Sequence, residues 1–486
     1  MQTQNKRNPK VVIIGAGMTG MLVAIKLREA GIHDIVILEK KDKIGGTWRE
    51  NTYPGVACDV PAHMYTYSFE PNPNWSHRFA YGDEIQAYFE HVATKYELLP
   101  LIQFNEAVES CHFKDAKWTL STSKGETYIA DFVVSATGIL HHPAKPDIPG
   151  LASFAGACFH TAEWDHTVSL QDKKVGVIGT GSTAAQVIPE VAKQASKLSV
   201  FQRTPQWLVN LPNKVFSEKT KARWLQKPQL LKRLHRWYTF GVEQTFSKAV
   251  IGKKFQHALI NILCRLNLWW SIKDPELRAK LRPDYRVGCK RIIVNSTFYK
   301  AIQKPNVDLV TEGIDRIVPE GLKTKDGKLH HLDVLILSTG FHPFNFMRPM
   351  DLRGKNGRKI DEQWGQKVQA YRSLLIPEFP NFFLMLGPNT PIGNFSVIAM
   401  SEVQTRYVLK LIQKWQAEEF EEVSATQAAL DDFNAYLKQG MSNTVWLGGC
   451  QSWYLDKDGD PAMWPYSWKQ WVKEMSELDM KDLLTE

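Results

Sequence analysis

Two stretches of the chain share a glycine spacing that is typical of dinucleotide binding. The first is KVVIIGAGMTGMLVAIKLREAGIHDIVILEK, in which Gly15, Gly17 and Gly20 stand between a strand pattern and a helix pattern, and Glu39 ends the next strand. In such a unit the first glycine makes a tight turn, the second lets the backbone approach a pyrophosphate, and the third lets the helix pack on the strand. We therefore predict a dinucleotide site here.

The second stretch, KKVGVIGTGSTAAQVIPEVAKQASKLSVFQRT, repeats this pattern with Gly179 and Gly181 in the turn and Ala184 in the third position. Where the first stretch ends its second strand in an acid, this one ends in Arg203. An acid binds a ribose 2′-hydroxyl but repels a 2′-phosphate, which an arginine attracts. The first site therefore suits FAD and the second NADPH, unless Arg203 is only a surface side chain. The predicted NADP contacts of this unit are Gly179, Thr180, Gly181, Ser182, Thr183, Ala184, Arg203 and Thr204.

The elements around these turns suggest how the chain is divided. FVVSATG, ending at Gly138, and LDVLILSTGF, ending at Phe341, are strand patterns that finish in a small-small-Gly step, and they bracket the second glycine unit. We therefore predict an α/β fold in which one Rossmann-like domain is inserted into another. The expected segments are 1–145 and 339–486 for FAD, 146–208 and 287–338 for NADP, and 209–286 for a helical insert.

The positive charge of the chain is concentrated in that insert. The 486 residues carry a net charge of +9, but from Lys214 to Arg291 there are 19 Lys or Arg against 5 Asp or Glu, a local charge of +14. Such a surface attracts phosphates, acidic substrates or an anionic membrane, unless it is an ordinary solvated helical face. No RNA-binding motif accompanies it, so we expect no nucleic-acid partner and at most a weak membrane-surface contact.

The cysteines and the chain start favour a reducing compartment. The six cysteines include no CxxC pair, so the sequence favours no disulfide scaffold, dithiol centre or metal site. MQTQNKRNPK does not resemble a secretory signal, and ALINILCRLNLWW is too short to span a bilayer and is interrupted by Arg265 and Asn267. We expect a cytoplasmic protein without a transmembrane helix.

With these features, the chain resembles the type I Baeyer–Villiger monooxygenases, a branch of the flavoprotein monooxygenases, over nearly its whole length. FAGACFHTAEWD matches the family fingerprint through Phe154, Gly156, His160, Trp164 and Asp165. GGTWRENTYPGVACD matches a second family motif through Gly46, Trp48, Tyr53, Pro54, Gly55 and Asp59. GCKRIIVNSTFY is similar to the family segment that carries a phosphate-binding lysine and an active-site arginine, here Lys290 and Arg291.

The resemblance implies an enzyme that uses NADPH, FAD and O₂, forms a C4a-peroxyflavin and converts a ketone to an ester or lactone. Arg291 would stabilise the negatively charged oxygen species, because a guanidinium keeps its charge at working pH. Asp59 would orient Arg291 as an ion-pair partner, although it could instead cap a loop. Lys290 would share the NADP 2′-phosphate with Arg203 and Thr204.

The remaining site residues follow from the same resemblance. His160 would set the position of the NADP domain from the linker, a role that is hard to separate from packing in that linker. The expected flavin contacts are Gly46, Thr47, Trp48, Asp59, Tyr65 and Val108. In TVWLGGCQSWYLDKDG, which we interpret as an irregular lid, Trp453 and Tyr454 are expected either to line the substrate pocket or simply to pack.

Three other functions compete with this interpretation. A heteroatom-oxidising flavin monooxygenase would usually carry Tyr or Phe in place of Trp164. A disulfide reductase with two dinucleotide sites would need a redox cysteine pair, and a non-enzymatic protein that retains a flavin would use the basic insert for binding. We expect a small-molecule ketone as substrate and a monomer or weak dimer.

Overall fold

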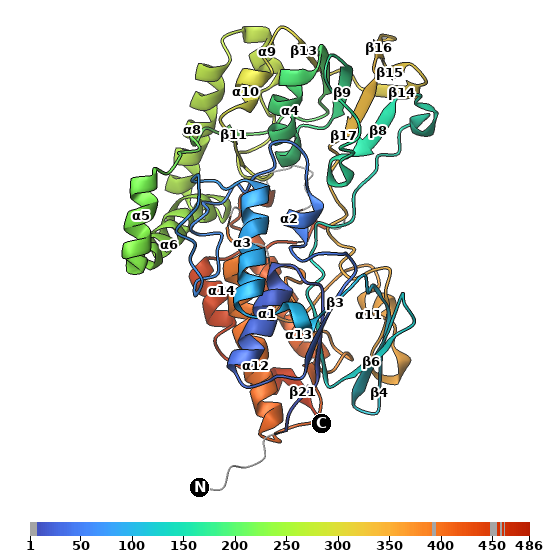
Figure 1. The fold of residues 1–486 in the computed structure, drawn as a ribbon, viewed down its shortest axis with the longest axis vertical. Helices are drawn as coiled ribbons and strands as arrows, with labels where there is room; N and C mark the ends of the chain where they lie inside the picture. Colours follow the sequence, from blue (N-terminus) through green and yellow to red (C-terminus); the bar gives the residue numbers. More distant parts are fainter. Residues whose placement is uncertain (1–6, 391–394, 448–453, 457–458, 461) are drawn as a thin grey trace.

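Two parallel five-stranded sheets form the framework of the chain, one in the lower half and one in the upper half of Figure 1. The computed structural model describes residues 7–390, 395–447, 454–456, 459–460 and 462–486. Helices flank both sheets, which is the arrangement that parallel strands need to bury both faces. The predicted α/β fold class is confirmed.

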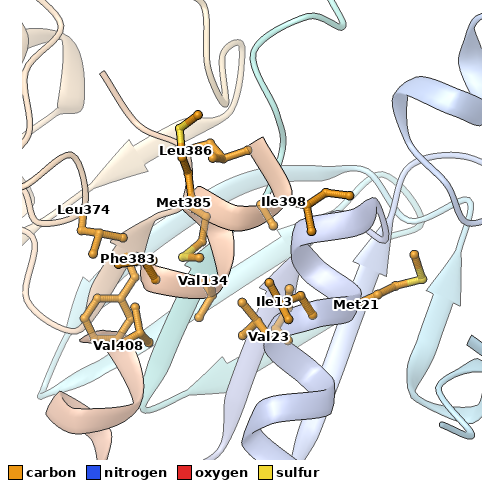
Figure 2. Packing of buried hydrophobic residues seen from close by; sticks show 14 of the residues in the cluster. Ile13, Met21, Val23, Val134, Leu374, Phe383, Met385, Leu386, Ile398 and Val408 are labelled. Carbon is orange, nitrogen blue, oxygen red and sulfur yellow. The ribbon is translucent and has the colours of Figure 1, made fainter. Parts of the chain in front are cut away.

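The first sheet collects strands from both ends of the chain. Its order is β19 (Phe382–Leu384), β7 (Phe132–Ser135), β1 (Val11–Ile14), β2 (Ile35–Glu39) and β3 (Ile102–Phe104). β1 and β7 are buried at every position, and α1 (Met18–Glu29) connects β1 to β2. α12 (Val397–Gln416) packs against α1, and Figure 2 shows Ile13, Val134 and Phe383 of the sheet in one buried cluster with Val408 of this helix.

The second sheet lies within the sequence interval between β7 and β19. Its order is β13 (Val307–Val310), β10 (Lys197–Phe201), β9 (Lys174–Ile178), β17 (Val334–Leu337) and β8 (Ala157–His160). α4 (Ser182–Gln194) connects β9 to β10, and α10 (Phe298–Ala301) packs against α4. The chain therefore leaves the first sheet after β7, completes the second and returns to the first at β19.

The described residues also form three smaller sheets. A further pair of strands belongs to the insert and is described with it below. The three sheets consist of β18 (Asp351–Arg353), β4 (Val108–Lys114), β5 (Lys117–Thr122) and β6 (Thr127–Ala130); of β14 (Ile314–Val318), β15 (Gly321–Thr324) and β16 (Leu329–His331); and of β20 (Val423–Ala425) with β21 (Leu483–Thr485). The remaining helices outside the insert are α2 (Thr47–Glu50), α3 (Gly82–Lys95), α11 (Ile360–Trp364), α13 (Gln427–Met441) and α14 (Trp468–Glu474).

The basic insert is helical and is closed at its base by a pair of short strands. β11 (Leu208–Val209) and β12 (Ile293–Val294) pair in parallel, so the two ends of the insert lie side by side. Between them lie α5 (Glu218–Gln226), α6 (Pro228–Val242), α7 (Lys248–Val250), α8 (Lys254–Ser271) and α9 (Pro275–Lys280). In the described ranges, no helix has both the length and the apolar character needed to cross a membrane.

Candidate active site

The first glycine turn lies beside the end of β7, where three backbone segments meet. Gly15 has φ +104°, and a Cβ there would lie only 2.7 Å from the carbonyl oxygen of Ala136. A side chain at Gly20 would overlap the carbonyl oxygen of Gly15, because α1 begins directly after the turn. The turn borders a cavity of about 430 Å³ that is large enough for part of a dinucleotide.

Glu39, the acid at the end of β2, faces this cavity. Its Oε2 accepts the N–H of Ala16 at 2.7 Å and its Oε1 accepts the N–H of Lys41 at 2.9 Å. Burial raises the pKa of the Glu39 carboxyl, and these two hydrogen bonds act in the opposite direction. Each oxygen keeps a lone pair that can accept a ribose hydroxyl.

The structure brings most of the other predicted flavin contacts around the same cavity, but Asp59 does not line it. The indole N–H of Trp48 donates to the hydroxyl of Tyr65 at 3.2 Å, and the two rings meet edge to face with centroids 5.6 Å apart. Thr47 begins α2 and Val108 begins β4, so both come from the ends of elements. The predicted residues that line the cavity are Gly15, Gly17, Glu39, Gly46, Thr47, Trp48, Tyr65 and Val108.

The second glycine turn repeats this local geometry on the second sheet. A side chain at Gly179 would overlap the carbonyl oxygen of Ser338, whereas no atom lies within 4 Å of a Cβ built on Gly181. The approach to the beginning of α4 is therefore open, and Ala184 is buried against the sheet. Thr180 Oγ1 donates to the carbonyl oxygen of Thr204 at 2.8 Å, which connects the turn to the segment that follows β10.

Arg203 and Lys290 are held close enough to influence each other. Burial lowers the pKa of Lys290, and the positive charge of Arg203 lowers it further. The Lys290 ammonium also lies 5.1 Å from the ring centre of Tyr285. Two cations gathered beside a dinucleotide turn suit a phosphate dianion, which would relieve their mutual repulsion.

Arg291 and Asp59, which are far apart in sequence, form a bidentate ion pair. Arg291 Nε donates to Asp59 Oδ2 at 2.9 Å and its Nη2 donates to Oδ1 at 2.6 Å. Burial acts to lower the pKa of the guanidinium, but the charge and hydrogen bonds of Asp59 outweigh burial, so that the pKa is raised. Arg291 is therefore a permanent cation with a fixed orientation.

Tyr454 lies close to Arg291. Its side chain is 1% exposed, and its ring meets that of Trp446 edge to face at 5.7 Å. Burial raises the pKa of Tyr454 to about 12, although the charge of Arg291 and a hydrogen bond from it act to lower the pKa. Trp453, the other predicted pocket residue, lies outside the described residues.

The fingerprint segment forms β8 and the turn that follows it. A side chain at Gly156 would overlap the carbonyl oxygen of Asp333, so the strand can approach its neighbour only with glycine here. The ring of Trp164 meets that of Phe159 edge to face at 5.1 Å, and Asp165 Oδ1 accepts the N–H of Thr167 at 2.9 Å. Phe154 is partly buried and packs against a hydrophobic cluster on the second sheet.

Trp164 also connects the fingerprint with the flavin motif. It lines a cavity of about 810 Å³ together with Trp48 and Gly55. The fingerprint and the flavin motif therefore face a common cavity.

His160 lies where the chain passes between the two sheets. It ends β8, its Nδ1 accepts the N–H of Ala162 at 3.1 Å, and its ring centre lies 5.8 Å from that of Phe341. Burial lowers the pKa of His160, whereas Glu163 and a hydrogen bond to the Gly340 backbone act to raise it. A neutral His160 thus contacts Phe341 and the backbone of Gly340, where the chain leaves the second sheet.

One contact between the two sheet regions was not predicted. Tyr53 Oη donates to Gln186 Oε1 at 2.9 Å, and Gln186 Nε2 donates to the carbonyl oxygen of Ala57 at 2.8 Å. A Cβ on Gly55 would lie 2.7 Å from the carbonyl oxygen of Gln186. The flavin motif therefore packs directly on α4. The Tyr-Pro-Gly run of the motif was the sequence feature that could have indicated this close approach of the two backbones.

The described cysteines differ in their oxidation state. Cys58, Cys111, Cys158 and Cys264 are free, whereas Cys289 is disulfide-bonded. Spacing in the sequence could not reveal this bond, because a disulfide depends on how the folded chain places two thiols. Among the described residues, no group of three or more His, Cys, Asp or Glu side chains is arranged to hold a metal ion.

Known proteins similar to this chain include monooxygenases from bacteria. Residues 12–248 match the family model described as pyridine nucleotide-disulphide oxidoreductase. An uncharacterized monooxygenase of Mycobacterium tuberculosis is 45% identical, with 95% of this chain and 93% of the relative covered. A Baeyer–Villiger monooxygenase of Streptomyces coelicolor is 38% identical, with 97% of this chain and 92% of the relative covered.

Solved structures agree with these relatives. A steroid monooxygenase bound to NADP superposes with a TM-score of 0.88 at 28% identity, covering 99% of both chains. A cyclohexanone monooxygenase from Rhodococcus bound to NADP⁺ gives a TM-score of 0.88 at 26% identity, covering 99% of this chain and 100% of the other. The match extends over both sheets and the insert.

Proposed function

The chain belongs to the Baeyer–Villiger monooxygenases, and on this premise we propose which of its residues bind the cofactors and which act on the ketone. The enzyme uses NADPH and O₂ to insert one oxygen atom beside a ketone carbonyl, giving an ester or lactone, NADP⁺ and water. FAD supplies the redox chemistry by accepting a hydride from NADPH and activating O₂. The protein has to bind both dinucleotides and stabilise the negative charge that develops on oxygen.

The cavity beside the first glycine turn fits FAD. Its walls combine the glycine turn, an acid for the ribose, and the aromatic pair Trp48 and Tyr65. Gly17 directly precedes α1, whose first N–H groups have no partner within the helix and can bind a pyrophosphate. Each feature therefore matches one part of the cofactor, namely pyrophosphate, ribose and ring system.

The second turn fits NADPH for a parallel reason. The open approach at Gly181 admits a pyrophosphate, and the paired cations Arg203 and Lys290 suit the 2′-phosphate that distinguishes NADPH from NADH. We propose that residues 146–208 and 287–338 form this NADP domain and that 1–145 and 339–486 form the FAD domain. The membership of the strands in the two sheets supports this division.

Arg291 carries the proposed chemistry. Attack on a ketone carbonyl leaves negative charge on its oxygen, and a preorganised cation stabilises that charge without having to reorient. Asp59 fixes the plane of the guanidinium through two hydrogen bonds, and Tyr454 lies close to it. We propose that Arg291 is the catalytic cation, that Asp59 and Tyr454 position it, and that His160 positions the NADP domain.

Replacement of Arg291 by alanine tests this assignment. The Arg291→Ala variant should form ester about 10² to 10³ times more slowly, because one preorganised donor is lost. NADPH should still reduce the bound flavin, measured as bleaching of flavin absorbance under anaerobic conditions. Ester formation at the wild-type rate would contradict the role of Arg291, and loss of flavin reduction together with ester formation would assign it to NADPH binding instead.

The small-molecule ketone is the partner expected of this family. A cytoplasmic location and a monomeric or weakly dimeric state stay predictions. Cell fractionation tests the first, and sedimentation velocity of the purified holoenzyme tests the second.

A further inference from the structure

The longest helix of the insert has a second apolar face that no other part of the described chain covers. On α8, Phe255, Leu259, Ile262 and Trp269 are 76%, 40%, 53% and 55% exposed. Their spacing places them on one side of the helix. The opposite side, represented by Cys264, is buried in the core of the second sheet. A surface helix of a monomer usually has one apolar face, which it buries in the core. A second, exposed apolar face indicates a surface that contacts a binding partner.

α6, in the same helical insert, carries further exposed apolar side chains. Trp237 and Phe240 are 65% and 61% exposed, although they occupy neighbouring turns of a helix that could have carried polar residues there. In Figure 1, α5, α6 and α8 form one edge of the molecule, on the side away from β14, β15 and β16. We call the exposed apolar residues of α6 and α8 the outer apolar surface.

Basic side chains surround the outer apolar surface. Lys253 and Lys254 are exposed at the beginning of α8, and Lys273 follows its end, 5.5 Å from the ring centre of Trp269. Arg265 lies between these ends and borders a hollow of about 490 Å³ beside Trp269. Two further arginines, Arg278 and Arg282, line the same hollow, whereas the nearby acids Asp274 and Glu276 do not.

We propose that the outer apolar surface docks on an anionic phospholipid membrane. A helix with tryptophans on its apolar face and a basic rim can lie in the plane of the interface, with its rings among the headgroups and its cations beside lipid phosphates. A second copy of the chain fits less well. A symmetric dimer through this surface would bring together two inserts that each carry the local charge of +14 between Lys214 and Arg291.

Vesicle flotation of the holoenzyme tests the proposal. The protein should float with phosphatidylcholine vesicles that contain phosphatidylglycerol, and stay unbound with phosphatidylcholine alone. Raising NaCl from about 50 mM to about 500 mM should release it, because salt screens the attraction. The Phe255→Ser/Trp269→Ser variant should bind roughly tenfold more weakly, and Lys254→Gln/Arg265→Gln/Lys273→Gln roughly a hundredfold, or about fivefold for each charge.

Matched variants on other faces of the protein distinguish docking through the outer apolar surface from non-specific vesicle binding. Ile129→Ser removes a side chain that is 53% exposed on β6, and Lys325→Gln/Lys328→Gln removes two exposed charges from the β15–β16 hairpin. Both controls should bind vesicles as the wild type does. All variants should keep the flavin spectrum and the Michaelis constant for NADPH, which shows that they fold.

Equal binding to neutral and anionic vesicles would overturn the proposal, and so would no vesicle binding at all by the folded holoenzyme. If the holoenzyme binds no vesicles and forms a dimer in sedimentation velocity that only the α8 variants dissociate, the outer apolar surface would be assigned to a second copy of the chain.

Discussion

The role that we propose for Asp59 depends on its charge as well as its shape. An Asp59→Asn variant keeps the size of the side chain but removes the carboxylate that holds both Nε and Nη2 of Arg291. We expect ester yield per NADPH consumed to fall about tenfold, because a less firmly oriented guanidinium stabilises developing charge less well. The measurement is product formed against NADPH oxidised.

A comparison variant distinguishes this effect from general loss of an ion pair. Asp131, at the start of β7, pairs with Lys117 and lies away from both glycine turns. The Asp131→Asn variant should leave the ratio of ester to NADPH unchanged. If both variants lowered the ratio equally, Asp59 would have no special relation to Arg291.

The depressed pKa of Lys290 predicts a pH dependence of NADPH binding. Burial and the charge of Arg203 favour the neutral amine, so in the free enzyme Lys290 loses its proton at a lower pH than an ordinary lysine. As pH rises, the Michaelis constant for NADPH should therefore rise, and it should rise at lower pH in the wild type than in Lys290→Arg. Coincident profiles of the two proteins would show that Lys290 does not touch the phosphate.

Among the secondary structure elements, β8 depends on a single glycine. A Gly156→Ala side chain would overlap the carbonyl oxygen of Asp333, so β8 would have to shift away from β17. We expect a loss of about 1 to 3 kcal/mol in unfolding free energy, measured by urea denaturation. Gly241→Ala on α6 is the control, since no atom lies within 4 Å of its Cβ and alanine favours a helix. A neutral Gly156→Ala would contradict this packing.

At the level of the assembled chain, His63 makes the contact between the insert and the rest of the protein sensitive to acid. Its ring lies 5.3 Å from that of Phe216 and 4.5 Å from that of Trp224, and the His235 ring hydrogen-bonds to its carbonyl oxygen at 2.9 Å. Burial, together with the neighbouring His235, lowers the pKa of His63 from 6.5 to about 4. Protonation therefore opposes folding in this region.

The sign of the effect follows from that shift. Because the unfolded chain binds this proton more readily, the stability that neutral His63 contributes is complete above about pH 6.5 and is lost as pH falls towards about 4. The loss is about 3 kcal/mol at most for this shift. Urea unfolding at several pH values should show a weaker dependence in His63→Leu. Identical slopes for both proteins would contradict the burial of His63.

Much of this architecture followed from the sequence, because it rests on short-range sterics. Glycine turns, buried strands and the helix after each turn are set by neighbouring residues, so both dinucleotide units could be located from their glycine spacing together with the strand and helix patterns around it. The Arg291 and Asp59 pair was expected only from family resemblance. Nothing in local spacing connects residues that are so distant in the chain.

The remaining features were decided by long-range packing. Three features depend on how segments that are distant in sequence meet in the fold. They are the position of Tyr454 near Arg291, the close packing of Gly55 against the backbone of Gln186, and the disulfide at Cys289. On α8 the sequence shows apolar residues on more than one side, and only the fold determines that Cys264 faces the core while Trp269 faces solvent. The reason is physical: helical periodicity defines faces, but burial depends on what the rest of the chain brings against each face.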